Sequence, residues 1–71
     1  MNVTVVTRSG KVAVIENFKK LTFWYNGDLK EYSTDFSAYL DYGRVTLNFI
    51  GDSQLSINSS DVEYFKVETS K

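Results

Sequence analysis

The 71-residue chain contains no cysteine, no histidine and no proline. Without cysteine it has no disulfide, no zinc ribbon and no thiol nucleophile. Without histidine it lacks the commonest metal ligand and the side chain best suited to proton transfer near neutral pH. A chain this short buries only about 60% of its unfolded surface, so its stability depends on hydrophobic packing and on any self-association. We expect neither a metal nor a cofactor.

An excess of charge of one sign is also absent. Nine acidic and eight basic residues give a formal net charge of −1. Binding to nucleic acid draws much of its affinity from cations that neutralise phosphates, so a nucleic-acid partner is disfavoured. No apolar run approaches the roughly 20 residues of a membrane helix. The first ten residues lack the basic and long apolar regions of a signal peptide. We therefore expect a cytoplasmic protein with no membrane contact.

Catalytic constellations are missing as well. Serine-based catalysis needs a base beside the hydroxyl, usually histidine, and no S-x-x-K spacing offers a lysine instead. The densest group of carboxylates comprises Asp28, Glu31, Asp35 and Asp41. One of them would need a pKa raised by burial to act as an acid, and a domain this small offers no deep cleft for that. We expect a protein that is not an enzyme.

What the chain does have is a series of alternating runs separated by turn residues, which is typical of an all-β protein. Residues 2–8 and 11–15 flank Ser9-Gly10 and predict a first hairpin. Residues 44–50, 54–58 and 62–68 predict three more strands. Most of the eleven aromatic residues are expected in the core, among them Phe23, Phe49 and Phe65.

The clearest local signal is LTFWYNGD, residues 21–28, because Asn-Gly between strand-like runs favours a two-residue hairpin loop. This loop predicts five opposed pairs: Tyr25–Asp28, Trp24–Leu29, Phe23–Lys30, Thr22–Glu31 and Leu21–Tyr32. Opposed residues share a face of the sheet. One face therefore carries Leu21, Phe23, Tyr25 and Tyr32 and is predicted to be the core. The single tryptophan, Trp24, falls on the other face together with Leu29.

The segment that follows has a helical pattern. Tyr32, Phe36, Tyr39 and Leu40 are spaced as one helical stripe, and Gly43 suits the position after a helix. These features favour a short helix or helical turn near 33–42. The alternative is a strand over 36–41 that pairs with 44–50.

Taken together, the pattern predicts one small β domain over residues 1–71. We expect a small antiparallel barrel or bent meander of five to seven strands, with one short helix or helical turn near 33–42. The stretch GDSQLSINSSDVEYFKVE contains strand, tight turn, short strand, one turn and last strand. This order resembles the closing half of SH3-like and Sm-like small barrels. The resemblance is of pattern only and implies no function.

Two interpretations of Trp24 follow. In the first, which we favour, the 33–42 segment folds back and covers Trp24 and Leu29 as a second apolar layer. In the second, Trp24 and Leu29 form an exposed patch with neighbouring tyrosines, because tyrosine and tryptophan are enriched at protein interfaces.

The function we expect is that of a non-catalytic protein-interaction module or small accessory protein, encoded by a phage or another mobile element. It would bind a protein partner, or itself as a homo-oligomer, through region 21–43. The candidate binding residues are Trp24, Leu29, Tyr39 and Tyr42. Edge pairing by the first or last strand is a second route to association. The alternative is a single-strand nucleic-acid binder with stacking rings and phosphate contacts, namely Trp24, Tyr25 and Tyr42 with Lys19, Lys20, Lys30 and Arg44.

Overall fold

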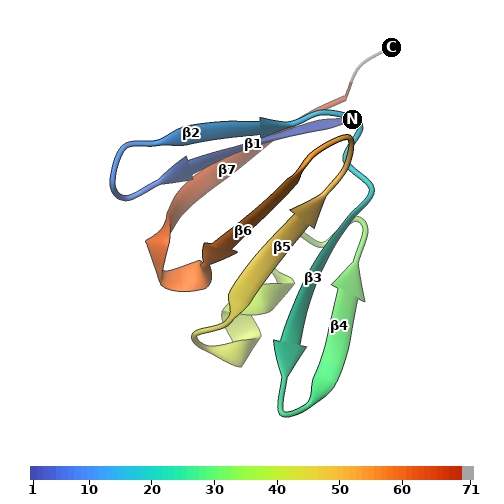
Figure 1. The fold of residues 1–71 in the computed structure, drawn as a ribbon, viewed down its shortest axis with the longest axis vertical. Helices are drawn as coiled ribbons and strands as arrows, with labels where there is room; N and C mark the ends of the chain where they lie inside the picture. Colours follow the sequence, from blue (N-terminus) through green and yellow to red (C-terminus); the bar gives the residue numbers. More distant parts are fainter. Residues whose placement is uncertain (70–71) are drawn as a thin grey trace.

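A computed structural model describes residues 1–69, which form seven β-strands and two 3₁₀ turns (Figure 1). The predicted all-β class is confirmed. The strands are β1 (Asn2–Thr7), β2 (Val12–Ile15), β3 (Lys20–Tyr25), β4 (Asp28–Tyr32), β5 (Thr46–Ile50), β6 (Gln54–Asn58) and β7 (Val62–Glu68). The 3₁₀ turns are η1 (Ala38–Tyr42) and η2 (Ser59–Asp61).

The strands form two antiparallel sheets rather than a closed barrel. One sheet has the order β2-β1-β7 and the other has the order β4-β3-β5-β6. The sheets meet where the Asp52 N–H donates to the Glu16 carbonyl at 2.9 Å, and they diverge away from that corner (Figure 1). β1 lies between β2 and β7 in its sheet, so the expectation that the first strand offers a free edge was wrong. β7 does lie at an edge.

The core fills the space between the two sheets. Its fully buried side chains are Val3, Val5, Ile15, Leu21, Phe23, Leu47 and Phe49. Each comes from the inward-facing side of its strand, as period-2 alternation requires. Burial of such a side chain is worth about 1.5–3 kcal/mol. Phe23 and Phe49 lie where the sequence predicts them, and Phe65 is half-buried against this cluster.

The predicted hairpin register is confirmed for all five pairs from Leu21–Tyr32 to Tyr25–Asp28. Asn26 and Gly27 have φ angles of 52° and 82°. Positive φ at both central residues is what a type I′ turn requires, and asparagine and glycine adopt it at little cost. The local turn chemistry therefore determines which side chains share a face.

The helical turn predicted near 33–42 is present, but it is the single five-residue 3₁₀ turn η1. The alternative strand over 36–41 does not form. Leu40 is 69% exposed, so it is not buried with the rest of the predicted apolar stripe. Gly43 ends the turn with φ of 73°, a value at which most side chains are strained.

Segment 33–43 packs on the inner face of the sheets. The ring of Phe36 lies 5.0 Å from Phe18 and 6.1 Å from Phe65, centroid to centroid. Tyr42 lies 5.2 Å from Phe23 and 4.8 Å from Tyr25 in the same way. The expectation that this segment covers Trp24 and Leu29 was therefore wrong, because its aromatic side chains pack against rings on the inner face of the sheets.

Candidate functional site

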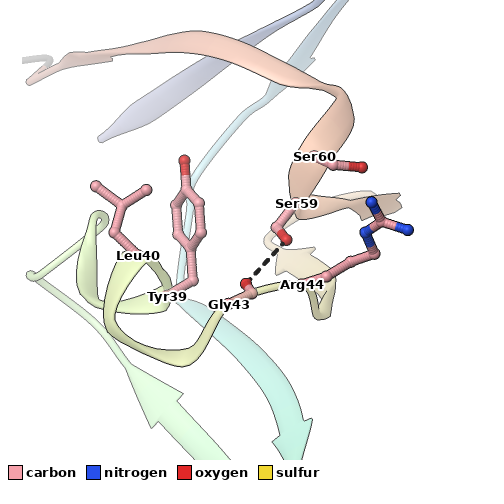
Figure 2. A pocket seen from close by; sticks show the side chains of 6 residues that line it. All are labelled: Tyr39, Leu40, Gly43, Arg44, Ser59 and Ser60. Carbon is pink, nitrogen blue, oxygen red and sulfur yellow. Dashed lines mark hydrogen bonds between the residues drawn. The ribbon is translucent and has the colours of Figure 1, made fainter.

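A shallow pocket of about 290 Å³ opens between η1 and η2. Its lining residues are Tyr39, Leu40, Gly43, Arg44, Ser59 and Ser60. Figure 2 shows the Arg44 side chain on the Ser59 and Ser60 side of the pocket, pointing away from Tyr39 and Leu40. The Ser59 hydroxyl is engaged by backbone groups, because it donates to the Gly43 carbonyl at 3.4 Å and accepts from the Val45 N–H at 3.0 Å. None of the six described lining residues is a carboxylate.

The acidic residues do not converge either. Within residues 1–69, no group of three or more histidine, cysteine or acidic side chains is placed to hold a metal ion. Glu31 instead forms a surface ion pair, with its Oε2 3.1 Å from the Lys20 Nζ. The residues that stand out are apolar side chains on the outer faces of the sheets.

Trp24 and Leu29 lie opposite each other on the outer face of the β3–β4 hairpin. Trp24 is 61% exposed and Leu29 is 44% exposed. The Trp24 side chain points away from the core because its neighbours along β3, Phe23 and Tyr25, face inward. Leu29 shares that outer face because it lies opposite Trp24. The two form an exposed apolar pair at the end of the sheet, where β3 extends past its last pairing with β5 at Thr22–Asn48.

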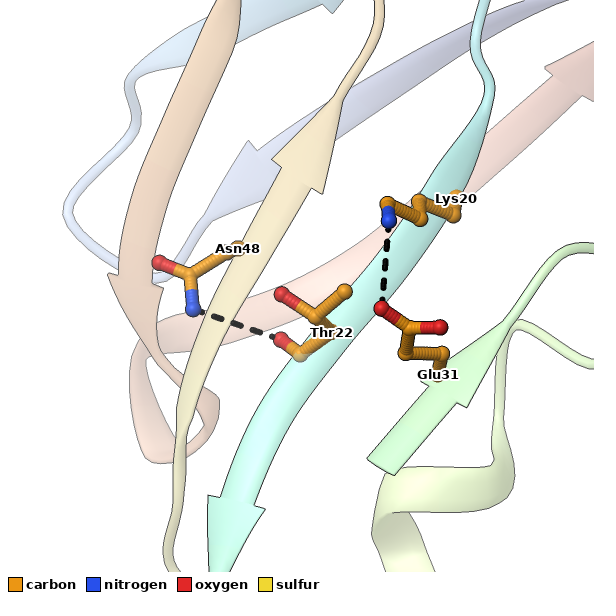
Figure 3. Close-up of polar contacts among 4 residues, drawn as sticks. All are labelled: Lys20, Thr22, Glu31 and Asn48. Carbon is orange, nitrogen blue, oxygen red and sulfur yellow. Dashed lines mark hydrogen bonds and ion pairs between the residues drawn. The ribbon is translucent and has the colours of Figure 1, made fainter. Parts of the chain in front are cut away.

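Polar groups lie next to this apolar pair on the same face, and Figure 3 shows them around Thr22. The Asn48 Nδ2 donates to the Thr22 carbonyl at 3.5 Å, and the Ser56 hydroxyl donates to the Asn48 Oδ1 at 2.7 Å. The Lys20–Glu31 ion pair lies on the other side of Thr22. Thr22 is buried beneath these groups although it points outward. We call Trp24, Leu29 and this border of Lys20, Glu31 and Asn48 the hairpin surface.

The opposite side of the hairpin is held in place by aromatic packing. Phe23 stacks on Tyr32 with ring centroids 5.7 Å apart and an interplanar angle of 16°. Tyr42 contacts both Phe23 and Tyr25, and the Lys30 Nζ lies 5.8 Å from the centroid of its ring. These contacts fix the strand that carries Trp24.

The four predicted binding residues are therefore divided. Trp24 and Leu29 lie together on the hairpin surface, whereas Tyr39 and Tyr42 belong to the inner side. Tyr39 is buried, and its burial raises the pKa of its hydroxyl. The hydroxyls of Tyr32 and Tyr42 lie 3.3 Å apart. That hydrogen bond is the main cause that raises the pKa of Tyr32.

This division also bears on the nucleic-acid interpretation. Its three stacking rings do not share a face, because Tyr25 and Tyr42 contact each other on the inner side while Trp24 points outward. One of its cations, Lys20, is paired with Glu31. Among the described residues, these three rings therefore do not form one row on which successive bases could stack.

A second apolar surface was missed from the sequence. Val12, Val6 and Tyr64 lie opposite one another across β2, β1 and β7, and Val14 lies one row further along. Val12, Val14 and Tyr64 are exposed. The signal was present in VAVI, residues 12–15, because an apolar run without alternation places apolar residues on both faces of a strand.

None of the helical segments within residues 1–69 is long and apolar enough to cross a membrane. Comparisons of the chain with protein-family models, curated proteins and solved structures find no match. The geometry of the two outer surfaces is therefore the basis for a functional proposal.

Proposed function

We propose that the protein is a non-catalytic interaction module that binds a protein partner through the hairpin surface. The observation that carries this proposal is the 61% exposure of Trp24 beside Leu29. Tryptophan is among the residues most enriched at the energetic centres of protein interfaces.

The composition of the hairpin surface supports this function. Protein interfaces combine an apolar centre with a polar rim that excludes water from it. Trp24 and Leu29 provide the centre, and the Lys20–Glu31 ion pair and the Asn48 amide provide polar groups beside it. A partner that places an apolar side chain against the indole would meet hydrogen-bonding groups within the same face.

The rigidity of the hairpin also favours binding. A surface that is already ordered loses little conformational entropy when a partner docks. Trp24 follows Phe23 in β3, and Phe23 is fully buried against aromatic rings. The indole is therefore presented on a fixed platform rather than on a mobile loop.

The size of the surface limits the kind of complex. A standard interface takes about 800 Å² from each partner, or about a sixth of the 4582 Å² that this chain exposes. Trp24 and Leu29 alone do not supply that area. The partner must extend over the polar border as well, or bind weakly and transiently.

Capture with matched variants tests the proposal. Immobilised wild-type protein, Trp24→Ser and Val14→Ser are compared for the partner that they retain from an extract. Val14 is the control because it is an exposed apolar strand residue on the other sheet. We expect wild type and Val14→Ser to retain the same partner and Trp24→Ser to bind it at least about tenfold more weakly. Equal affinity of Trp24→Ser and wild type would contradict the proposal.

A further inference from the structure

The last strand, β7, has a free edge. It pairs with β1 on one side, and no described strand pairs with it on the other. No backbone hydrogen bond outside the strand ladders reaches residues 63–68 in the described part of the chain. β7 is also the longest strand, with seven residues. Such an edge presents unpaired N–H and C=O groups to another chain.

Apolar side chains beside this edge are incompletely covered on both faces of the sheet. On the inner face, Phe65 is half-buried although its ring lies near Phe36, Tyr39 and Phe49. Val67, on the same face, is 40% exposed. On the outer face, Tyr64 is 51% exposed at the end of its row with Val6 and Val12. The sheet therefore ends where apolar area remains to be buried.

We propose that β7 is the interface of a two-fold symmetric homodimer. Two copies of β7 pair antiparallel with Phe65 at the symmetry axis, and the two sheets become one six-stranded sheet in the order β2-β1-β7-β7-β1-β2. This association does not depend on the hairpin surface, which lies on the other sheet.

The side chains of β7 select this register. Opposed residues must share a face, so symmetric registers differ in steps of two residues. With Phe65 at the axis, Tyr64 of each copy faces Lys66 of the other copy, and Phe65 faces Phe65 of the second copy. With Lys66 at the axis, two cations oppose each other, which destabilises a sheet. With Tyr64 at the axis, Lys66 faces Val62, which lies at the irregularity in the β1–β7 ladder.

Symmetry also explains why a second copy fits this edge better than an unrelated strand. An unrelated strand would have to present an aromatic residue opposite Lys66 and a cation opposite Tyr64, spaced two residues apart. The second copy presents both because each copy carries both. The lysine stem then covers the tyrosine ring, and its ammonium lies where a cation–π contact forms. On the outer face, the row of Val12, Val6 and Tyr64 is then continued by the apolar stem of Lys66 from the second copy.

Two charge variants of one exposed residue test the proposal. In Tyr64→Lys, two lysines oppose each other at both symmetric positions, whereas Tyr64→Glu places a carboxylate opposite Lys66. Both variants lose the same aromatic ring at the same outward position, so the main difference between them is the sign of the charge. Circular dichroism verifies that each monomer stays folded.

Sedimentation equilibrium over a range of protein concentrations gives the dimer dissociation constant. We expect wild type and Tyr64→Glu to dimerise and the dissociation constant of Tyr64→Lys to rise at least tenfold. A wild-type protein that stays monomeric at millimolar concentration would overturn the proposal. So would equal weakening by both variants, because packing through the valine row would respond to loss of the ring and not to the sign of charge.

Cross-linking tests the register itself, since the chain has no cysteine of its own. Tyr64→Cys and Lys66→Cys are mixed under oxidising conditions and compared with each variant alone. We expect the mixed pair to form a disulfide-linked dimer several-fold faster than either variant alone. Faster self-linking of Lys66→Cys would place Lys66 at the axis and refute the register. Trp24→Ser should dimerise as wild type does, so this interface and the hairpin surface can fail separately.

Discussion

Phe23 and Trp24 are adjacent in β3, yet Phe23 is fully buried and Trp24 is 61% exposed. The alternation of a strand produces this contrast, because successive side chains point to opposite faces. Phe23 faces Tyr32 and Tyr42 in the space between the sheets. Trp24 faces outward, opposite its cross-strand partner Leu29.

This contrast predicts unequal effects on stability. Phe23→Ala should lower the free energy of unfolding by about 3–5 kcal/mol, because it removes a buried ring and leaves a cavity. Trp24→Ser should cost no more than about 1 kcal/mol, the value of a cross-strand pair on an exposed face. Urea unfolding followed by circular dichroism measures both. A loss of several kcal/mol in Trp24→Ser would mean that the indole is buried in solution.

The fluorescence of Trp24 provides a second test, because it is the only tryptophan in the chain. We expect red-shifted emission that a soluble quencher reduces strongly, at every protein concentration. The dimer proposed above buries β7 and leaves Trp24 exposed, so dilution should not change the spectrum. Blue emission that turns red on dilution would show instead that a second copy covers the hairpin surface.

The position of Gly51 leaves no room for a side chain. A Cβ at this position would lie 2.6 Å from Ile15 Cγ2 and 2.7 Å from the Glu16 carbonyl oxygen. The backbone at the corner where the two sheets meet would have to move, so Gly51→Ala should lower stability by about 1–3 kcal/mol. Ser53→Ala, in the same turn but exposed, is the control and should stay within about 0.5 kcal/mol of wild type. Similar unfolding midpoints for the two variants would rule out the close approach.

The β3–β4 hairpin shows how much a sequence determines when local and long-range signals agree. Asn26-Gly27 fixes the loop length, and the loop length fixes which residues face each other. All five predicted pairs, and the outward direction of Trp24, follow from that one dipeptide.

The position of segment 33–43 could not be derived in the same way. Its aromatic stripe predicts that one side is buried, but it does not identify the sheet face that buries it. The segment lies on the inner face because Phe36 and Tyr39 pack against Phe65 of β7 and Tyr42 packs against Phe23 of β3. Which strands bring these rings together depends on strand order, which no local pattern encodes.

Short single-stranded oligonucleotides distinguish the hairpin surface from a nucleic-acid site. Titration at low salt should leave the Trp24 emission unchanged, because the rings of Tyr25 and Tyr42 lie on the other side of β3 and Lys20 is paired with Glu31. Quenching that weakens steeply as salt rises would support the nucleic-acid interpretation, since counterion release produces that dependence.

Burial of Tyr39 predicts that the protein loses stability at high pH. Desolvation raises the pKa of Tyr39 above its ordinary value of 10.0 in the folded state. The unfolded chain therefore releases this proton first, and it binds fewer protons than the folded chain does between the two pKa values. The contribution of the protonated Tyr39 hydroxyl to stability is fully present below pH 10, and it is lost as the pH rises through the pKa of Tyr39 in the folded state. Tyr32 contributes with the same sign, chiefly through its hydrogen bond with Tyr42.

Urea unfolding at a series of pH values from 8 upward measures this decline. The control is Tyr39→Phe, which keeps the buried ring and removes the ionising hydroxyl. We expect the variant to lose less stability than wild type over the same pH range, with the remaining decline due in part to Tyr32. Identical pH profiles for the two proteins would mean that the Tyr39 hydroxyl is solvated in the folded state.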